Sequence, residues 1–267
     1  MKNTRKAFTL AELLVIIAII VILALMLMSA LTGGGPAPVN KAKLEMSALC
    51  TAIEAYHSVY GRYPVSPAAL EQAARDANDP ASPISNNGDF TYGGVLPAPH
   101  GKTIAVGTLV NGRPLPNSEV ISILMDYTNF PNHPGQSTVN TNHGLNIQNT
   151  LFLNTAKSSA TNSPGVGPDL VYRDPWGHPY IITMDLNGDG QCNDSFYGLQ
   201  QVSQHNGAIG FYGLSNNVDA GGNGPHFQFH SPVMVWSGGP KIGSLQGVDT
   251  NSPANVGANK NQVLSWQ

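Results

Sequence analysis

The hydrophobic pattern divides the chain into one continuous apolar segment near its start and a long region of short, interrupted apolar runs. Every residue from Leu13 to Met28 is apolar, and with its flanks this stretch reaches the about 20 residues that a helix needs to cross a bilayer. Residues 1–7 contain basic residues and no acidic one. The apolar run therefore predicts a transmembrane helix over 8–32. Because basic residues stay on the cytoplasmic side, we expect the remainder of the chain to be exported.

Helical spacing returns after a stretch of Gly and Pro. Residues 33–39 predict a joint, since both residue types disfavour a helix interior. Beyond it, apolar side chains recur at intervals of three and four residues, so we expect an amphipathic helix over 40–61 that packs on a sheet. Gly61 suits the C-terminal cap of that helix. The apolar positions are Met46, Leu49, Ile53, Tyr56 and Tyr60.

The exported region, 40–267, otherwise alternates short apolar runs with turn-forming residues. Over 79–168, Asn, Gly, Pro and Thr predict a loop-rich insertion with a few strands or a short helix. Over 169–267, runs such as Tyr180 to Met184 predict a C-terminal sheet with loops. The fold class is therefore α+β, with helices followed by a small antiparallel sheet and long loops.

The net charge and the distribution of basic residues argue against one class of binding partner. The formal net charge is −3 and the pI is near 6.2, and the basic residues are scattered, so nucleic acid is not an expected partner. The cysteines, Cys50 and Cys192, lie far apart. They either form one disulfide in an oxidising compartment or remain two free thiols.

Glu12 is the one formal charge between Phe8 and Leu31. A carboxylate inside an apolar helix costs roughly 2.5 to 3.5 kcal/mol on insertion scales, so a plain anchor has no reason to keep it. The run from Lys6 to Ile20, with Phe-Thr-Leu-Ala-Glu at 8–12, resembles the signal of type IV prepilins and type II secretion pseudopilins.

This resemblance implies how the start of the chain is processed. A prepilin peptidase cuts between Ala7 and Phe8, removes the leader 1–7 and methylates the new Phe8 amine. Glu12 then pairs with the amine of a neighbouring subunit during assembly. The family usually has Gly before the cut, where this chain has Ala7.

Two further segments resemble the major pseudopilin of type II secretion: Gly-Arg-Tyr-Pro at 61–64 and Asp-Pro-Trp-Gly-His-Pro-Tyr at 174–180. The resemblance implies a pilin-like fold and a single-pass inner-membrane protein with a cytoplasmic N-terminus and a periplasmic domain. It also implies a structural subunit, not an enzyme, that assembles into a pseudopilus promoting protein export. The implied partners are the prepilin peptidase, the inner-membrane assembly platform and homologous pseudopilin subunits.

Two alternatives remain open. One is a type IV pilin or minor pilin, and the other is a membrane-anchored, calcium-dependent periplasmic hydrolase. The sequence contains no HExxH, GxSxG, Walker A or GxGxxG motif that would indicate a particular enzyme class.

An acidic segment near residue 190 begins like a calcium-binding loop, with oxygen side chains at its first, third and fifth positions and Gly at the sixth. The twelfth position is Phe196 instead of a bidentate Glu, which excludes a full EF-hand. The segment therefore predicts a calcium site or, alternatively, a turn whose Asx side chains bind their own backbone. The candidate ligands are Asp185, Asn187, Asp189, Gln191, Asn193 and Asp194.

Overall fold

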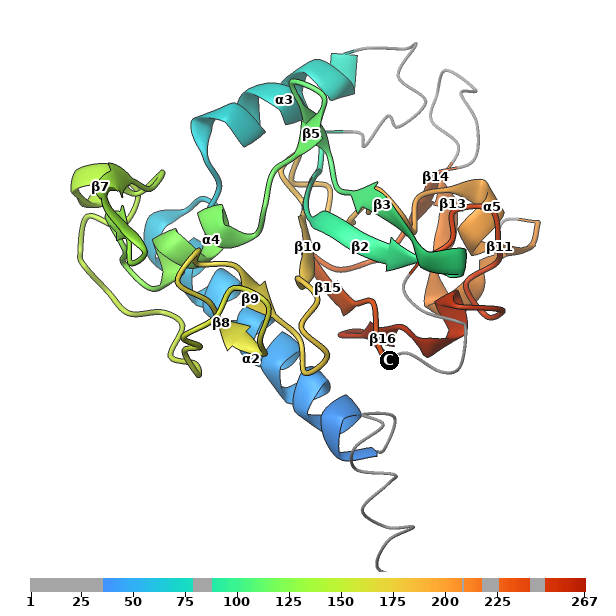
Figure 1. Cartoon of the computed structure of the whole chain (residues 1–267). Helices are drawn as coiled ribbons and strands as arrows, with labels where there is room; N and C mark the ends of the chain where they lie inside the picture. Colours follow the sequence, from blue (N-terminus) through green and yellow to red (C-terminus); the bar gives the residue numbers. More distant parts are fainter. Residues whose placement is uncertain (1–35, 79–87, 208, 218–225, 241–247) are drawn as a thin grey trace, which may run out of the picture.

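The computed structural model describes residues 36–78, 88–207, 209–217, 226–240 and 248–267. Its longest element is the helix α2 (Pro36–Tyr60), which runs from the bottom of Figure 1 toward its left side. The predicted amphipathic stripe is confirmed, because Met46, Leu49, Ile53 and Tyr56 are fully buried and Tyr60 is partly buried.

The start of α2 differs from the sequence-based expectation. The helix begins at Pro36, so residues 36–39 of the predicted joint are helical, and residues 33–35 lie outside the described residues. Proline is tolerated in the first helical turn because the N–H groups there have no partner within the helix. At the other end, Gly61 has φ +64° and donates its N–H to the His57 carbonyl at 2.8 Å, as expected of a C-terminal cap.

A four-stranded antiparallel sheet packs on α2. Its strand order is β1 (Phe90–Tyr92), β10 (Ile181–Met184), β15 (Val233–Ser237) and β16 (Val263–Leu264). In the register of this sheet Thr183 pairs with Thr91 on one side and with Met234 on the other.

Both faces of this central sheet are buried. Ile182 and Val235 join the core under α2, while Ile181, Met234 and Trp236 belong to a second core on the opposite face. In Figure 1, β10 and β15 lie between α2 and a group that includes α5 (Gln200–Ser203) and the strands from β11 (Gln204–Asn206) to β14 (His226–Gln228). Burial on both faces explains why these strands are apolar at nearly every position.

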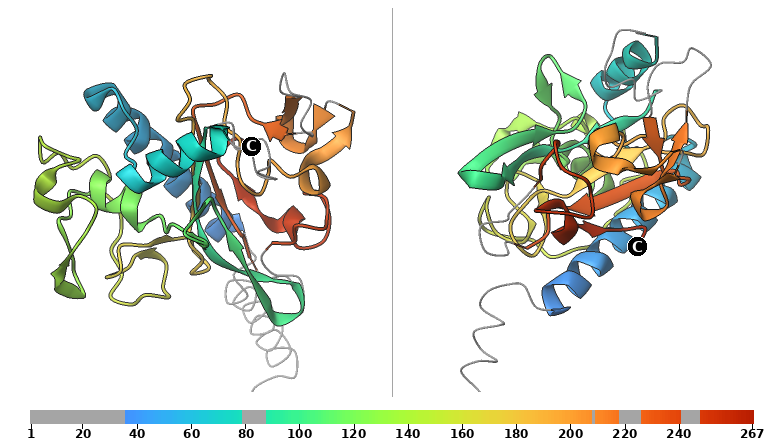
Figure 2. Two further views of the ribbon diagram at one scale, coloured as in Figure 1. Left: turned by 90° about the horizontal axis from the view of Figure 1, so that it is seen from above. Right: turned by 90° about the vertical axis from the view of Figure 1, so that its right-hand side faces the viewer.

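The remaining elements are short. A second antiparallel sheet has the order β11–β12–β13–β14, and the hairpin of β2 and β3 extends from the body in both views of Figure 2. The other helices and strands are α3 (Pro67–Asn78), β2 (Gly94–Ala98), β3 (Lys102–Val106), β4 (Leu109–Val110), β5 (Arg113–Pro114), α4 (Ser118–Leu124), β6 (Asn129–Phe130), β7 (His133–Ser137), β8 (Gly165–Val166), β9 (Tyr172–Arg173), α5 (Gln200–Ser203), β11 (Gln204–Asn206), β12 (Ile209–Gly210), β13 (Ser215–Asn217) and β14 (His226–Gln228). Single 3₁₀ turns occur at Pro99–Gly101, Thr141–His143, Phe211–Gly213 and Asn259–Asn261.

The segment 79–168 consists of short strands, the helix α4 and loops in its described part, which begins at residue 88. This segment also contributes to the central sheet and to the core. It supplies β1 to the central sheet, and Val120, Ile121 and Leu124 of α4 to the core under α2. The insertion is therefore part of the structural core.

Candidate functional site

The predicted processing and assembly residues, Ala7, Phe8 and Glu12, lie outside the described residues, as does the predicted transmembrane helix over 8–32. Among the helices that the structure does describe, none is both long enough and apolar enough to span a membrane. Of the predicted sites, the structure describes the acidic loop, residues 185–194, which joins β10 to the region before α5.

Asp185 organises the first half of the acidic loop. Its carboxylate oxygens accept the backbone N–H groups of Gly188 at 2.7 Å and Gly190 at 2.8 Å. Both glycines have positive φ, +77° and +79°, a conformation that glycine adopts without steric cost. The carboxylate of Asp185 thus holds the backbone of Gly188 and Gly190 in a tight turn.

On the exposed side of the acidic loop, the side chains of Asn187 and Asp189 also accept backbone N–H groups. The Oδ1 atom of Asn187 accepts the Asp189 N–H at 2.8 Å, and Oδ1 of Asp189 accepts the Gln191 N–H at 2.8 Å. These are Asx turns, in which the side chain bonds the backbone two residues ahead. Among the described residues, Oδ2 of Asp189 accepts a hydrogen bond from the Asn187 amide, at 3.3 Å.

Asp89, from a distant part of the chain, contacts the acidic loop. Its Oδ2 accepts the N–H of Asn193 at 2.7 Å. The residue is fully buried, and its Oδ1 has no hydrogen-bond partner among the described residues. Burial raises the pKa of Asp89 to about 8, and the charges of Asp185 and Asp189 act in the same direction. No motif or spacing in the sequence indicates a role for this residue.

Asp194 is a structural group in the second core. Oδ2 accepts hydrogen bonds from the Thr183 hydroxyl at 2.6 Å and from the Trp236 indole at 3.1 Å. Oδ1 accepts the backbone N–H groups of Phe196 and Tyr197, each at 2.9 Å. A carboxylate offers about four acceptor positions, and these four hydrogen bonds occupy them, which argues against the predicted role of Asp194 as a ligand.

The predicted calcium ligands are thus only partly brought together. Asp185, Asn187 and Asp189 share the turn, whereas Asn193 is buried and donates its N–H to Asp89, and Gln191 contributes its N–H to the Asx turn. In the ranges that the structure describes, no three His, Cys, Asp or Glu side chains are gathered closely enough to hold a metal ion. The unpartnered oxygen of Asp89 is the feature that fits a cation.

Asp174, the first residue of the Asp-Pro-Trp-Gly segment, holds its turn together. Its Oδ1 accepts the N–H groups of Trp176 and His178, each at 2.9 Å, and its Oδ2 accepts the Ser237 hydroxyl at 2.5 Å. The turn is thereby tied to β15. Burial raises the pKa of Asp174 to about 7, and burial also lowers the pKa of His178.

The two cysteines are free thiols, so the disulfide alternative is not realised. Cys50 packs against the core under α2, whereas Cys192 belongs to the second core, across the central sheet. Burial raises the pKa of Cys50 to about 11 and that of Cys192 well above its ordinary value. Both are protonated at neutral pH.

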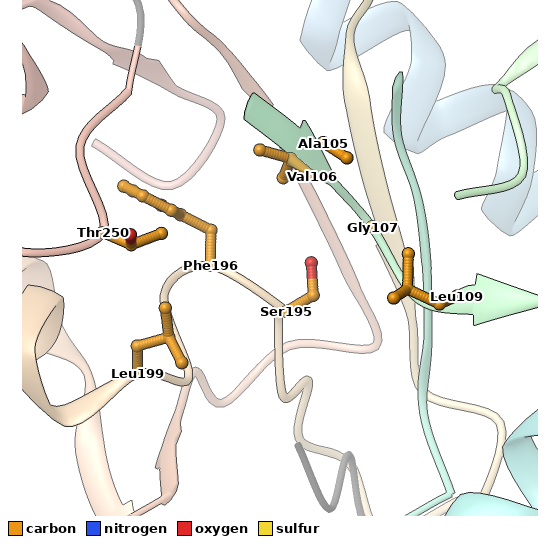
Figure 3. A pocket seen from close by; sticks show the side chains of 8 residues that line it. All are labelled: Ala105, Val106, Gly107, Leu109, Ser195, Phe196, Leu199 and Thr250. Atoms are coloured by element: carbon orange, nitrogen blue, oxygen red, sulfur yellow. The ribbon is translucent and has the colours of Figure 1, made fainter. Parts of the chain in front are cut away.

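A pocket of about 180 Å³ lies beside the second core and contains none of the predicted site residues. Figure 3 shows apolar side chains from β3 and from the segment after the acidic loop lining it, with the Ser195 hydroxyl among them. That hydroxyl has no hydrogen-bond partner among the described residues.

The start of the chain matches a known family. Residues 2–28 match the family described as the prokaryotic N-terminal methylation motif. The match is consistent with a type IV prepilin-like protein, a class that is anchored in the membrane, processed by prepilin peptidase and assembled with pilin-like subunits. No curated protein and no solved structure matches the chain.

Proposed function

We propose that this protein is a structural subunit of a type II secretion pseudopilus and has no enzymatic activity of its own. The observation that carries the proposal is the methylation motif at 2–28, because a cleaved and methylated N-terminus serves assembly. The architecture agrees with it: one helix, α2, begins shortly after the motif and lays its apolar stripe on an antiparallel sheet. The preference for a pseudopilin over a pilin of another kind rests on the resemblance of residues 61–64 and 174–180 to the major pseudopilin.

The first experiment is mass spectrometry of the mature N-terminus. We expect N-methyl-Phe8 in cells with an active prepilin peptidase, whereas recovery of a chain that still begins at Met1 would contradict the proposal. Deletion of the protein then separates the two filament functions. Loss of protein secretion supports the pseudopilus, whereas intact secretion with loss of surface fibres supports the type IV pilin or minor pilin. Purified protein that turns over a substrate by itself would favour the membrane-anchored hydrolase.

Glu12 is proposed to set the register of each incoming subunit. After cleavage the Phe8 amine is a new positive charge, and Glu12 lies one helical turn away, within reach of the amine of a staggered neighbour. Unpaired charges are costly at low dielectric, so pairing favours one register. Glu12→Ala should accumulate in the membrane, cleaved and folded, but fail to enter filaments. Glu71→Ala, which removes an exposed carboxylate on α3, is the matched control.

We further propose that the subunit binds calcium at the acidic loop, with Asp89 in place of Asp194 as a ligand. Backbone N–H groups fix the carboxylates of Asp185 and Asp89. Oδ1 of the exposed Asp189 accepts the Gln191 N–H, which leaves its Oδ2, in a long contact of 3.3 Å with the Asn187 amide, available to an ion. Calcium prefers such a set of carboxylate and amide oxygens. A bound cation would also satisfy the orphaned Oδ1 of Asp89 and relieve the repulsion between these carboxylates.

Calcium titration of the mature protein after treatment with chelator tests this assignment. At 100 times the dissociation constant, calcium should add about 2.7 kcal/mol to the free energy of unfolding. Asp89→Asn keeps the acceptor for the Asn193 N–H but removes the charge, and should weaken calcium binding. Asp249→Asn changes another Asx-turn carboxylate and should leave binding unchanged. If chelator does not alter the melting temperature of the wild type, the acidic loop is only a turn.

A further inference from the structure

Three Asn-Gly pairs have both residues in the described part of the chain: Asn111–Gly112, Asn187–Gly188 and Asn206–Gly207. Asn followed by Gly is chemically labile, because a glycine leaves the backbone nitrogen unshielded for attack on the asparagine side chain. The surroundings of the first two pairs differ sharply, and the difference decides their reactivity. The third pair adjoins residue 208, which lies outside the described residues, so it does not enter the comparison.

Asn111 and Gly112 form the tip of the hairpin between β4 and β5. Val110 pairs with Arg113, which leaves a two-residue turn with φ of +52° at Asn111 and +78° at Gly112. Both residues are exposed, and no atom lies within 4 Å of the Cβ position at Gly112. The N–H of Gly112 has no hydrogen bond to any described residue. The nucleophile of the reaction is therefore unprotected.

The pair Asn187–Gly188 is equally exposed, and the Cβ position at Gly188 is equally open, but its hydrogen bonds differ from those of the first pair. The Gly188 N–H is donated to Oδ1 of Asp185 at 2.7 Å. The side chain of Asn187 is held as well, because its Oδ1 accepts the Asp189 N–H at 2.8 Å. Attack would have to break both hydrogen bonds and turn the amide nitrogen away from a carboxylate.

We propose that Asn111 is a site of spontaneous deamidation, and that the hydrogen bonds of the acidic loop protect Asn187 from the same reaction. At Asn111 the backbone nitrogen of Gly112 loses its proton to water or hydroxide and forms a bond to the side-chain Cγ. The Cγ–Nδ2 bond breaks and ammonia leaves, which gives a cyclic imide. Water then opens the ring at either carbonyl and yields aspartate or isoaspartate, with no oxidant or cofactor involved.

The product changes the hairpin. Isoaspartate adds one methylene to the backbone and a negative charge, and a two-residue turn with two left-handed positions has no room for the extra atom. The pairing of Leu109 with Pro114 should loosen as a result. Leu109 also lines the pocket of Figure 3, so the lining of that pocket should change with it.

The test is peptide mapping of the mature protein after incubation at alkaline pH in ¹⁸O-water with chelator. Deamidation at Asn111 should be at least about tenfold faster than at Asn187, since a hydrogen bond to a charged group must first be broken at Asn187. Asn111→Gln should abolish the fast modification. Asp185→Ala should free the Gly188 N–H and accelerate reaction at Asn187, whereas Asp249→Ala, at another Asx turn, should not.

Equal rates at Asn111 and Asn187 in the folded wild type would overturn the proposal, as would an unmodified Asn111. The wild-type comparison does not depend on any variant folding correctly. Digestion of the unfolded chain serves as the reference, because both Asn-Gly pairs should react at similar rates once the hydrogen bonds of the acidic loop are lost.

Discussion

Asp174→Asn should remove a large part of the pH dependence of stability. The pKa of Asp174 is raised from 3.8 to about 7 in the folded protein because the carboxylate is buried. The folded state therefore holds this proton more tightly than the unfolded state. The stabilisation is fully present below about pH 4 and is lost as the pH rises through about 7. The asparagine side chain resembles the protonated acid in shape and does not titrate.

The expected change in the free energy of unfolding follows from the difference between the pKa of Asp174 in the folded protein and its ordinary value. A change of roughly three pKa units corresponds to about 4 kcal/mol, at 1.36 kcal/mol per unit. The wild type should therefore lose up to about 4 kcal/mol more than the variant between pH 4 and pH 8. The constant cost of replacing the acceptor of the Ser237 hydroxyl cancels in this slope.

The assay is urea unfolding of the mature protein at a series of pH values, with chelator present so that metal binding does not contribute. Contributions from other groups are common to both proteins and drop out of the difference. Parallel curves for the wild type and Asp174→Asn would refute the reasoning. They would mean that the hydrogen bonds from Trp176, His178 and Ser237 stabilise the charged form as much as burial opposes it.

Three further outcomes follow from the packing. Tyr180→Phe removes the hydrogen bond of 2.6 Å to Glu45 of α2 and should lower the free energy of unfolding by about 1 kcal/mol in urea titrations. Gly93→Ala would place a Cβ 1.9 Å from the backbone oxygen of Val106, and a loss of about 3 kcal/mol is expected by the same measurement. Reduction with dithiothreitol should leave the melting temperature unchanged, because both thiols are free.

Several features could be predicted from the sequence because they depend on local geometry. The stripe of α2 has the spacing of one helical face, and the run ending at Met184 forms the strand β10. The Asx turns at Asn187 and Asp189 also follow from residues a few positions apart. The N-terminal motif is likewise local, and its match at 2–28 is independent of the folded domain.

Only the tertiary structure decided which distant groups meet. Asp89 and Asn193 are separated by 104 residues, and nothing in either local sequence indicates that one bonds the other. The same holds for Asp194, which the pattern assigned to calcium but which bonds Trp236 inside the core. The cysteines stay apart because the central sheet lies between their two cores. Periodicity reports the conformation of one segment, whereas the partner of a buried carboxylate depends on which segments fold against one another.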